Sequence, residues 1–302
     1  MNTEPLKFDE REKRNYVLGL PFAESVQETY AEAAKEILLP FPSVPLMDFP
    51  KLTKLTGGFR SREFSILCGA TGIGKTTLIA NISKSLISQN IPHFVASVET
   101  GRTDFVKRTM AAYVGEDWNT GESVSVDKLK GFHSRYGINF QRDSLWLSLY
   151  ESRFSVETLM SDIAWMVEHK GAKIATIDNL NFFMEVKRAT DQIIEMDRVI
   201  HELVIFCKQV DVHVIMVMHP KKTESKRVES EFDIKGSSTA VQEAHNVFLF
   251  NRPADDLVES GFASKWDREL TIAKMRRKGR AVGSRLILKG IAGVRYEEGD
   301  VL

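Results

Sequence analysis

An octapeptide in the first third of the chain carries the residue types that bind phosphate groups. Residues 69–76 read Gly-Ala-Thr-Gly-Ile-Gly-Lys-Thr, a complete G-x-x-x-x-G-K-T pattern between the apolar run 64–68 and a helix expected from Lys75. Glycines let consecutive backbone N–H groups point at phosphate oxygens, and the N-terminus of a helix adds its positive dipole end. The lysine reaches the β and γ phosphates, and the threonine hydroxyl binds Mg²⁺. An ordinary glycine-rich turn is the alternative interpretation.

We therefore predict a site for ATP, or for another NTP or dNTP, together with Mg²⁺. The residues expected to line it are Gly69, Ala70, Thr71, Gly72, Ile73, Gly74, Lys75, Thr76, Thr77 and Asp178. Asp178 ends the apolar run 173–178, and a site of this kind needs a carboxylate at the end of a neighbouring strand to hold the metal. Thr76 and Asp178 are the expected Mg²⁺ ligands. An aspartate that caps a helix or forms a turn is the alternative for Asp178.

Two further residues follow apolar runs, so their side chains are expected at the same edge of a sheet. Glu99 follows 93–98, and we predict that it is the general base that activates the attacking water. His219 follows 212–218, and we predict that it senses the γ phosphate. A plain surface glutamate and a histidine without a chemical role are the alternatives.

These residues require a scaffold that brings several strand ends to one edge. The short apolar runs that alternate with amphipathic helical stretches cover 64–68, 93–98, 145–149, 173–178 and 212–218. Strands that are apolar on both faces and separated by helices indicate an α/β fold with a mostly parallel, twisted sheet and helices on both faces. After Asn246, the runs NVFLF, ELTIAKM and SRLILKG are joined by tighter loops and indicate an antiparallel C-terminal extension.

Composition places the chain among ordinary globular proteins. Its 302 residues include 41 Lys+Arg and 41 Asp+Glu, and 43% are hydrophobic, which excludes a disordered tail and a uniformly basic nucleic-acid coat. The two cysteines, Cys68 and Cys207, lie far apart in apolar runs and are expected to be core thiols of a reducing compartment. No apolar run approaches the roughly 18 to 20 residues of a membrane span. We expect a cytoplasmic protein without a membrane partner.

The N-terminal region differs from the remainder. Residues 23–39 place apolar side chains on one stripe of a helix, and four prolines within 40–50 indicate a linker after it. We predict an N-terminal arm and linker helix over 1–42 and one ATPase domain over 43–302. Packing of the helix on its own domain is the alternative to a contact with another subunit.

The ordered motifs resemble the RecA-type motor domain of hexameric replicative helicases of superfamily four, the DnaB and Twinkle type. The resemblance extends over about residues 45–300 and is carried by GATGIGKT, SVET, IATIDNLNFFM, VIMVMHPKK, DIKGSSTAVQEAHNVFLF and AKMRRKGRAVG. It covers neither a primase half nor the large N-terminal domain of the bacterial helicases. It implies a RecA-like P-loop NTPase and an ATP-dependent replicative DNA helicase that moves 5′ to 3′ on single-stranded DNA. It further implies a homo-oligomer, a hexameric ring linked by the N-terminal helix, with a primase, polymerase or loader as further partners.

Carried over by residue, the resemblance repeats the catalytic roles of Lys75, Glu99 and His219 and adds two cations. Arg276 becomes an arginine finger and Lys274 its neighbour, both acting on nucleotide held by the next subunit. The dense run Arg276–Arg280 leaves open which arginine is the finger, and a solvated basic hairpin is the alternative.

The resemblance also implies that a polar loop faces a central channel and holds single-stranded DNA. The residues expected to bind DNA are Lys221, Lys222, Lys226, Arg227, Gly236 and Ser237, with Lys187 and Arg188 as a weaker second group. Lysines and arginines follow a phosphate backbone without reading bases. Carboxylates in the same loop oppose this interpretation, and a plain mobile surface loop is the alternative.

Two other functions remain open at this point. A RecA/RadA-like or KaiC-like DNA-dependent ATPase would use the same nucleotide site without unwinding DNA. A non-catalytic assembly factor would bind ATP only to hold a partner, but the complete set of catalytic residue types disfavours it.

Overall fold

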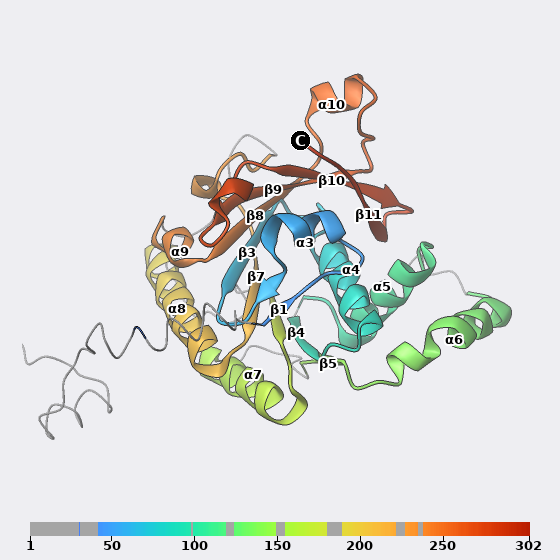
Figure 1. The fold of residues 1–302 in the computed structure, drawn as a ribbon, viewed down its shortest axis with the longest axis horizontal. Helices are drawn as coiled ribbons and strands as arrows, with labels where there is room; N and C mark the ends of the chain where they lie inside the picture. The colour runs from blue at the N-terminus through green and yellow to red at the C-terminus, as the bar shows by residue number, and fades with distance from the viewer. Residues whose placement is uncertain are drawn as a thin grey trace, which may run out of the picture. The chain divides into compact units, whose positions relative to one another are not determined.

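A nine-stranded sheet forms the centre of the described structure, a computed structural model (Figure 1). The structure describes Tyr30 and residues 42–97, 99–118, 124–148, 155–179, 189–221, 227–234 and 238–302; of 189–192 and 238–240 it describes the backbone alone. The strands are β3 (Phe64–Gly69), β4 (His93–Ser97), β5 (Leu145–Leu147), β6 (Ile174–Asp178), β7 (His213–Met218), β8 (Asn246–Asn251), β9 (Arg268–Met275), β10 (Arg285–Ile291) and β11 (Arg295–Val301). Their order across the sheet is β11-β10-β9-β8-β3-β7-β6-β4-β5.

The mode of strand pairing changes once across this sheet, from parallel to antiparallel. Strands β5, β4, β6, β7, β3 and β8 are mutually parallel, and β9, β10 and β11 continue the sheet in antiparallel fashion. The predicted α/β fold with an antiparallel C-terminal extension is therefore confirmed. One detail of the prediction is wrong: NVFLF forms β8, which pairs in parallel with β3, so the extension begins only at β9. The sequence interpretation also omitted β11.

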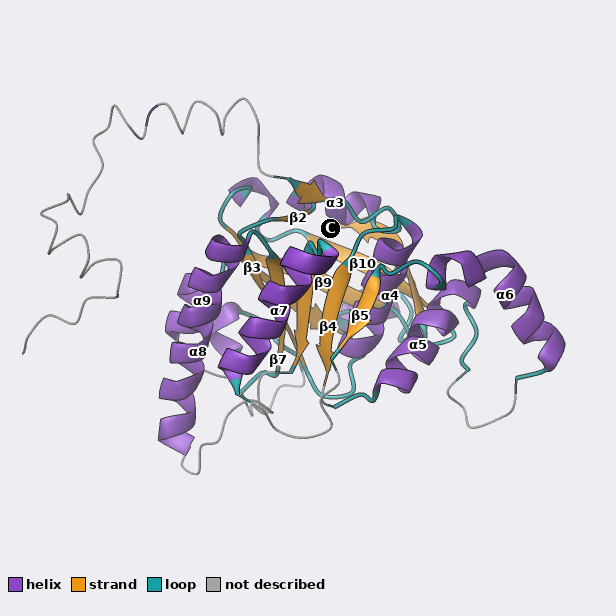
Figure 2. Cartoon of the chain, turned by 90° about the horizontal axis from the view of Figure 1, so that it is seen from below, coloured by secondary structure: helices purple, strands orange, loops and turns teal. Residues whose placement is uncertain are grey.

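Helices cover the sheet on both sides, as Figure 2 shows. They are α3 (Pro50–Thr56), α4 (Lys75–Ser88), α5 (Arg102–Val114), α6 (Val126–Phe140), α7 (Val156–Lys170), α8 (Ala189–Val210), α9 (Ser238–Glu243) and α10 (Asp255–Glu259). The apolar faces of α7 and α8 pack on one side of the sheet, and those of α3 and α4 pack on the other. Every residue of β3 is buried, which places the strand that leads into the octapeptide at the centre of the core.

The region predicted as a proline linker is partly built into the domain. Ser43–Val44 form β1, which pairs with β2 (Phe59–Arg60), and α3 begins at Pro50. Leu46 and Phe49 are buried in the same core cluster as α4. The predicted linker is therefore wrong for residues 43–50, because the apolar side chains of Leu46 and Phe49 are buried in the core.

Residues 43–302 form one compact unit. The helix expected over 23–39 lies outside the described residues except for Tyr30, and the role of 1–42 as a subunit contact stays a prediction. Both cysteines are buried as expected, and burial raises the pKa of each thiol to about 12. Within the described ranges, no helix is both long enough and apolar enough to span a bilayer.

Candidate nucleotide site

The glycine-rich octapeptide forms the turn between β3 and α4, in the strand-loop-helix setting that phosphate binding requires. Gly74 precedes the first turn of α4 with a φ of 102°. A Cβ at this position would lie 2.5 Å from the hydroxyl oxygen of Tyr296 on β11. Only glycine therefore satisfies both the backbone conformation and the close approach of Tyr296.

Lys75 points into the loop that precedes it. Its side-chain nitrogen donates hydrogen bonds to the carbonyl oxygens of Gly69, at 2.7 Å, and Ala70, at 3.0 Å. The residue is 6% exposed, and burial lowers the pKa of the ammonium, an effect that Asp178 opposes first among its neighbours. A buried cation without an opposite charge in direct contact is costly unless an anion binds beside it. The loop is thus arranged to receive phosphate.

The two expected metal ligands, Thr76 and Asp178, meet where α4 begins and β6 ends. Thr76 Oγ1 donates a hydrogen bond of 2.8 Å to Asp178 Oδ2. Asp178 ends β6 and is 2% exposed; burial raises the pKa of its carboxyl, while the Thr76 hydroxyl and Lys75 act in the opposite direction. Hydroxyl and carboxylate oxygens are hard ligands of the kind that Mg²⁺ binds.

These donors fit a metal that is held mainly by water and nucleotide phosphates. Among the described residues, no cluster of three or more His, Cys, Asp or Glu side chains could hold a metal ion alone. Mg²⁺ is usually bound through one or two carboxylates plus phosphate oxygens and keeps several waters. A single carboxylate beside one hydroxyl matches that mode.

Glu99 and His219 are joined by a residue that sequence analysis missed. Asn179 Nδ2 lies 3.0 Å from Glu99 Oε2 and 3.2 Å from His219 Nε2. His219 Nδ1 in turn lies 3.3 Å from Lys75 Nζ and 3.4 Å from Thr71 Oγ1. Asn179 directly follows Asp178 at a strand end, and this position is the feature of the sequence that could have indicated its place in the site. The expected base and the expected sensor are therefore in one network with the phosphate loop.

The C-terminal strands support the phosphate loop from behind, which the sequence did not indicate. Arg268, at the start of β9, donates from Nε to the carbonyl oxygen of Ile73 at 2.7 Å. Asn81 of α4 donates to the carbonyl of Val294 and accepts from the backbone N–H of Tyr296. The loop and the first turns of α4 thus rest on β9 and β11. Thr77, which was also predicted to line the nucleotide site, is buried in α4.

Lys274 and Arg276 lie away from this network. Met275 pairs with Asn246, and Asn246 is level with Ser65 near the start of β3, whereas the phosphate loop follows the end of β3. The end of β9 is therefore at the opposite edge of the sheet. Lys274 Nζ donates to the carbonyls of Val241 and Gln242, and Arg276 Nη2 donates to those of Gln242 and Glu243, all in α9.

The candidate DNA residues are only partly described. Lys187, Arg188, Lys222, Lys226, Gly236 and Ser237 lie outside the described residues. Lys221 is exposed and donates from Nζ to the carbonyl of Phe232 at 2.7 Å. Arg227 donates to the carbonyl of Arg252 and pairs with the fully buried carboxylate of Glu269. Arg227 thus anchors the end of its loop to the sheet, a position the sequence interpretation did not expect.

Comparison with known proteins agrees with this geometry. A model of the family described as DnaB-like helicase C terminal domain matches residues 46–290. The chain belongs to this family. It is thus a replicative DNA helicase motor that hydrolyses nucleoside triphosphates, and the predicted family, fold and activity are confirmed.

Solved structures support the fold of this DnaB-like domain. One, described as the ATPase domain of G40P, is 19% identical, with 92% of this chain and 100% of that chain covered and a TM-score of 0.72. Another, of a DnaB-like replicative helicase and its interactions with primase, is also 19% identical, with 96% and 72% covered and the same TM-score of 0.72. Membership of the family disfavours the non-catalytic assembly factor.

Proposed function

We propose that this DnaB-like domain hydrolyses Mg²⁺-ATP at the site around Lys75 and uses the energy to move 5′ to 3′ on single-stranded DNA. Lys75 neutralises the β and γ phosphates, and Thr76 and Asp178 hold the metal, which supplies charge neutralisation at the phosphates. Glu99 takes the proton of the attacking water, and His219 contacts the γ phosphate. The observation that carries the proposal is the single network from Lys75 through His219 and Asn179 to Glu99.

We further infer that the site is completed by a second subunit. In one chain, Arg276 and the phosphate loop are at opposite edges of the sheet, so Arg276 does not reach its own nucleotide. Head-to-tail contact between copies brings the end of one β9 to the phosphate loop of the next copy, and such contacts close into a ring. A cation inserted at the γ phosphate typically accelerates phosphoryl transfer by 10³ to 10⁵. A hexamer is the ring size that the family resemblance favours.

Single-stranded DNA is the proposed track, and the loop around Lys221 is the proposed contact. Lys221 is exposed, and the anchor of Arg227 on Glu269 fixes one end of the loop. The interaction with primase that names one similar structure makes a primase the first candidate partner here as well.

A forked duplex tests the direction of movement. We expect the protein with ATP and Mg²⁺ to displace the strand of a fork that has a 5′ single-stranded tail and to leave a matched fork with only a 3′ tail intact. Displacement is followed by gel or by fluorescence dequenching, and the Lys75→Ala variant is the control. DNA-stimulated hydrolysis without displacement of either fork would contradict the proposal and favour the recombinase-like alternative.

The contact between subunits is proposed to use the predicted N-terminal helix and the surface of α6. Leu129 and Ile138 of α6 are 50% and 57% exposed, large values for such side chains. Figures 1 and 2 show α6 at the periphery of the domain. Residues 23–39 offer a complementary apolar stripe with glutamates at every fourth position. Helix α6 also carries Lys128, which pairs with Glu116, and Arg135.

Sedimentation with a non-hydrolysable ATP analogue tests this contact. We expect deletion of residues 1–40 to convert rings into smaller species, and Leu129→Glu to act in the same direction. Ile194→Glu, which changes an apolar residue on α8 that is 69% exposed, is the control and is expected to keep the ring. Rings that persist without residues 1–40 would contradict the proposal.

A further inference from the structure

Two neighbouring arginines at the end of β9 have different partners. The backbone N–H of Arg276 donates to the carbonyl of His245 at 3.0 Å, and its guanidinium contacts only α9 carbonyls among the contacts the structure gives it. Arg277 Nε lies 3.1 Å from Glu63 Oε1, and the Glu63 side chain is 6% exposed. Arg276 thus contacts backbone carbonyls, which water can replace, whereas Arg277 contacts a buried carboxylate.

Glu63 directly precedes β3 and belongs to a chain of buried polar groups at the start of that strand. Asn246 Nδ2 lies 3.0 Å from Glu63 Oε2 and 3.1 Å from Ser65 Oγ, and Ser65 Oγ lies 2.9 Å from His213 Nε2. His213 Nδ1 lies 2.7 Å from the carbonyl oxygen of Arg60, so Nδ1 carries the proton and Nε2 accepts from Ser65. Burial lowers the pKa of His213 to about 4, which keeps the ring neutral at physiological pH.

The charge in this network has one described counterion. Asn246, Ser65 and His213 are neutral, so Arg277 is the group that balances the Glu63 carboxylate. If the Arg277 side chain left Glu63 to contact nucleotide in a neighbouring subunit, the Glu63 carboxylate would remain buried without its cation, which is strongly unfavourable. Arg277 is therefore poorly suited to be the finger.

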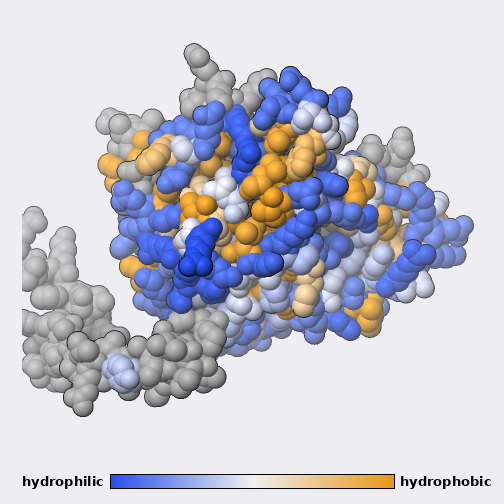
Figure 3. All heavy atoms as spheres, turned by 45° about the horizontal axis from the view of Figure 1, so that its top comes forward, coloured by the Kyte–Doolittle hydropathy of each residue, from blue (hydrophilic) through white to orange (hydrophobic). Residues whose placement is uncertain are grey.

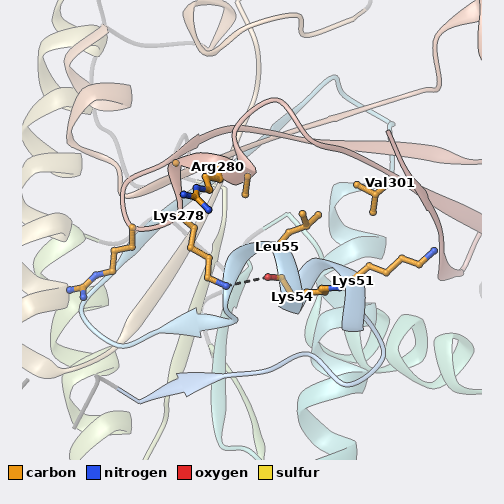
Figure 4. A pocket seen from close by; sticks show the side chains of 9 residues that line it. Lys51, Lys54, Leu55, Lys278, Arg280 and Val301 are labelled. Atoms are coloured by element: carbon orange, nitrogen blue, oxygen red, sulfur yellow. Dashed lines mark hydrogen bonds between the residues drawn. The ribbon is translucent and has the colours of Figure 1, made fainter. Parts of the chain in front are cut away.

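The next residue is held as well. Lys278 Nζ donates to the carbonyl of Lys54 at the end of α3, at 3.1 Å. Figure 4 shows this contact at a pocket of about 790 Å³ whose rim carries Lys51, Lys54 and Arg280 and whose wall includes Leu55 and Val301. Figure 3 shows the molecule with the top of Figure 1 brought forward, where hydrophobic side chains gather in a band between hydrophilic ones. Residues 277 and 278 are thus tied to two elements of their own domain.

We propose that Arg277 is a positioning residue whose ion pair with Glu63 ties the end of β9 to the start of β3 and so fixes where Arg276 projects. The proposal rests on the proposed function, in which Arg276 acts on nucleotide of the next subunit. It adds a mechanical link. Strand β3 starts beside Glu63 and ends at the phosphate loop. This six-residue strand therefore connects the subunit's own nucleotide site to Arg276, which acts on the nucleotide of the next subunit.

A double-mutant cycle on DNA-stimulated ATP hydrolysis tests the link. We expect Arg277→Met and Glu63→Gln each to lower kcat by about tenfold to a hundredfold, with KM for ATP changed less than about twofold, because misplacement impairs the transition state and leaves binding intact. The double variant is expected to be no worse than either single variant. Arg277→Lys should recover most of the activity, and Lys173→Ala, an exposed lysine at the same edge of the sheet, should leave kcat unchanged.

The other outcomes separate this proposal from the proposed function. If Arg277→Met lowers kcat as strongly as Arg276→Met while Glu63→Gln has no effect, Arg277 is the finger and the proposal is overturned. Additive effects of the two substitutions would also overturn it. If Arg276→Met alone hydrolyses ATP normally, the trans finger of the proposed function fails; a loss of kcat in Arg277→Met beside a normal Arg276→Met would overturn the positioning role of Arg277. Should Glu63→Gln not fold, the comparison of Arg277→Met with Arg277→Lys still decides, because Arg277 is half exposed.

Discussion

Replacing Lys75 with alanine is expected to lower ATP hydrolysis by about a thousandfold or more and to abolish DNA unwinding. The expectation follows from position: the ammonium is buried in the phosphate loop and contacts only carbonyl oxygens and His219 among its recorded partners. Negative charge on the transferring phosphoryl group develops beside it, and a preorganised cation in a site with little water is worth several kcal/mol in the transition state.

The measurement is steady-state hydrolysis with and without single-stranded DNA, followed by thermal unfolding. Because Lys75 is a buried cation whose pKa is lowered by burial, its removal is not expected to lower the melting temperature. Lys84→Ala on the same helix removes a half-buried cation that pairs with Asp48 at 3.1 Å, away from the phosphate loop, and is the matched control, expected to retain activity. Hydrolysis retained in Lys75→Ala would place the active site elsewhere.

Replacing Glu99 with glutamine is expected to lower kcat by about 10² to 10⁴ while ATP binding is retained. Glu99 is exposed at the strand-end edge and contacts Asn179, so glutamine keeps the shape and an acceptor oxygen but cannot take a proton from water. Loss of kcat with unchanged affinity is the signature of a group that acts only in the transition state.

Single-turnover hydrolysis and titration with a fluorescent ATP analogue measure the two quantities separately. Glu168→Gln, an exposed glutamate on α7, is the matched control. A Glu99→Gln variant with normal kcat would remove the proposed base.

The spacing of residues 69–76 and the apolar runs were enough to predict the fold, because strand, loop and helix here are consecutive in sequence. The same local reasoning placed Asp178, Glu99 and His219 at one edge, and the structure brings them together with Lys75. Their chemical roles stay predictions. Asn179 was missed because an asparagine after a strand has many ordinary uses.

Longer-range features were not accessible in this way. A strand that is apolar on both faces does not reveal its direction, so the parallel pairing of β8 was not predicted. Arg227 looked like a surface cation because Glu269, its buried partner, is 42 residues away. The supports from Arg268 and Tyr296 are still more distant, and contacts of that kind leave no periodic pattern in a sequence.

The support of the phosphate loop by β11 also bears on the order of events during synthesis. A nascent chain acquires Gly74 and α4 early, but the carbonyl of Val294 and the ring of Tyr296 emerge from the ribosome more than 200 residues later. Closing so long a loop is among the slower steps of folding. A chain released before β11 has been made thus carries an intact phosphate-binding motif on an unsupported helix, and the support of the nucleotide site is complete only after β11 has folded.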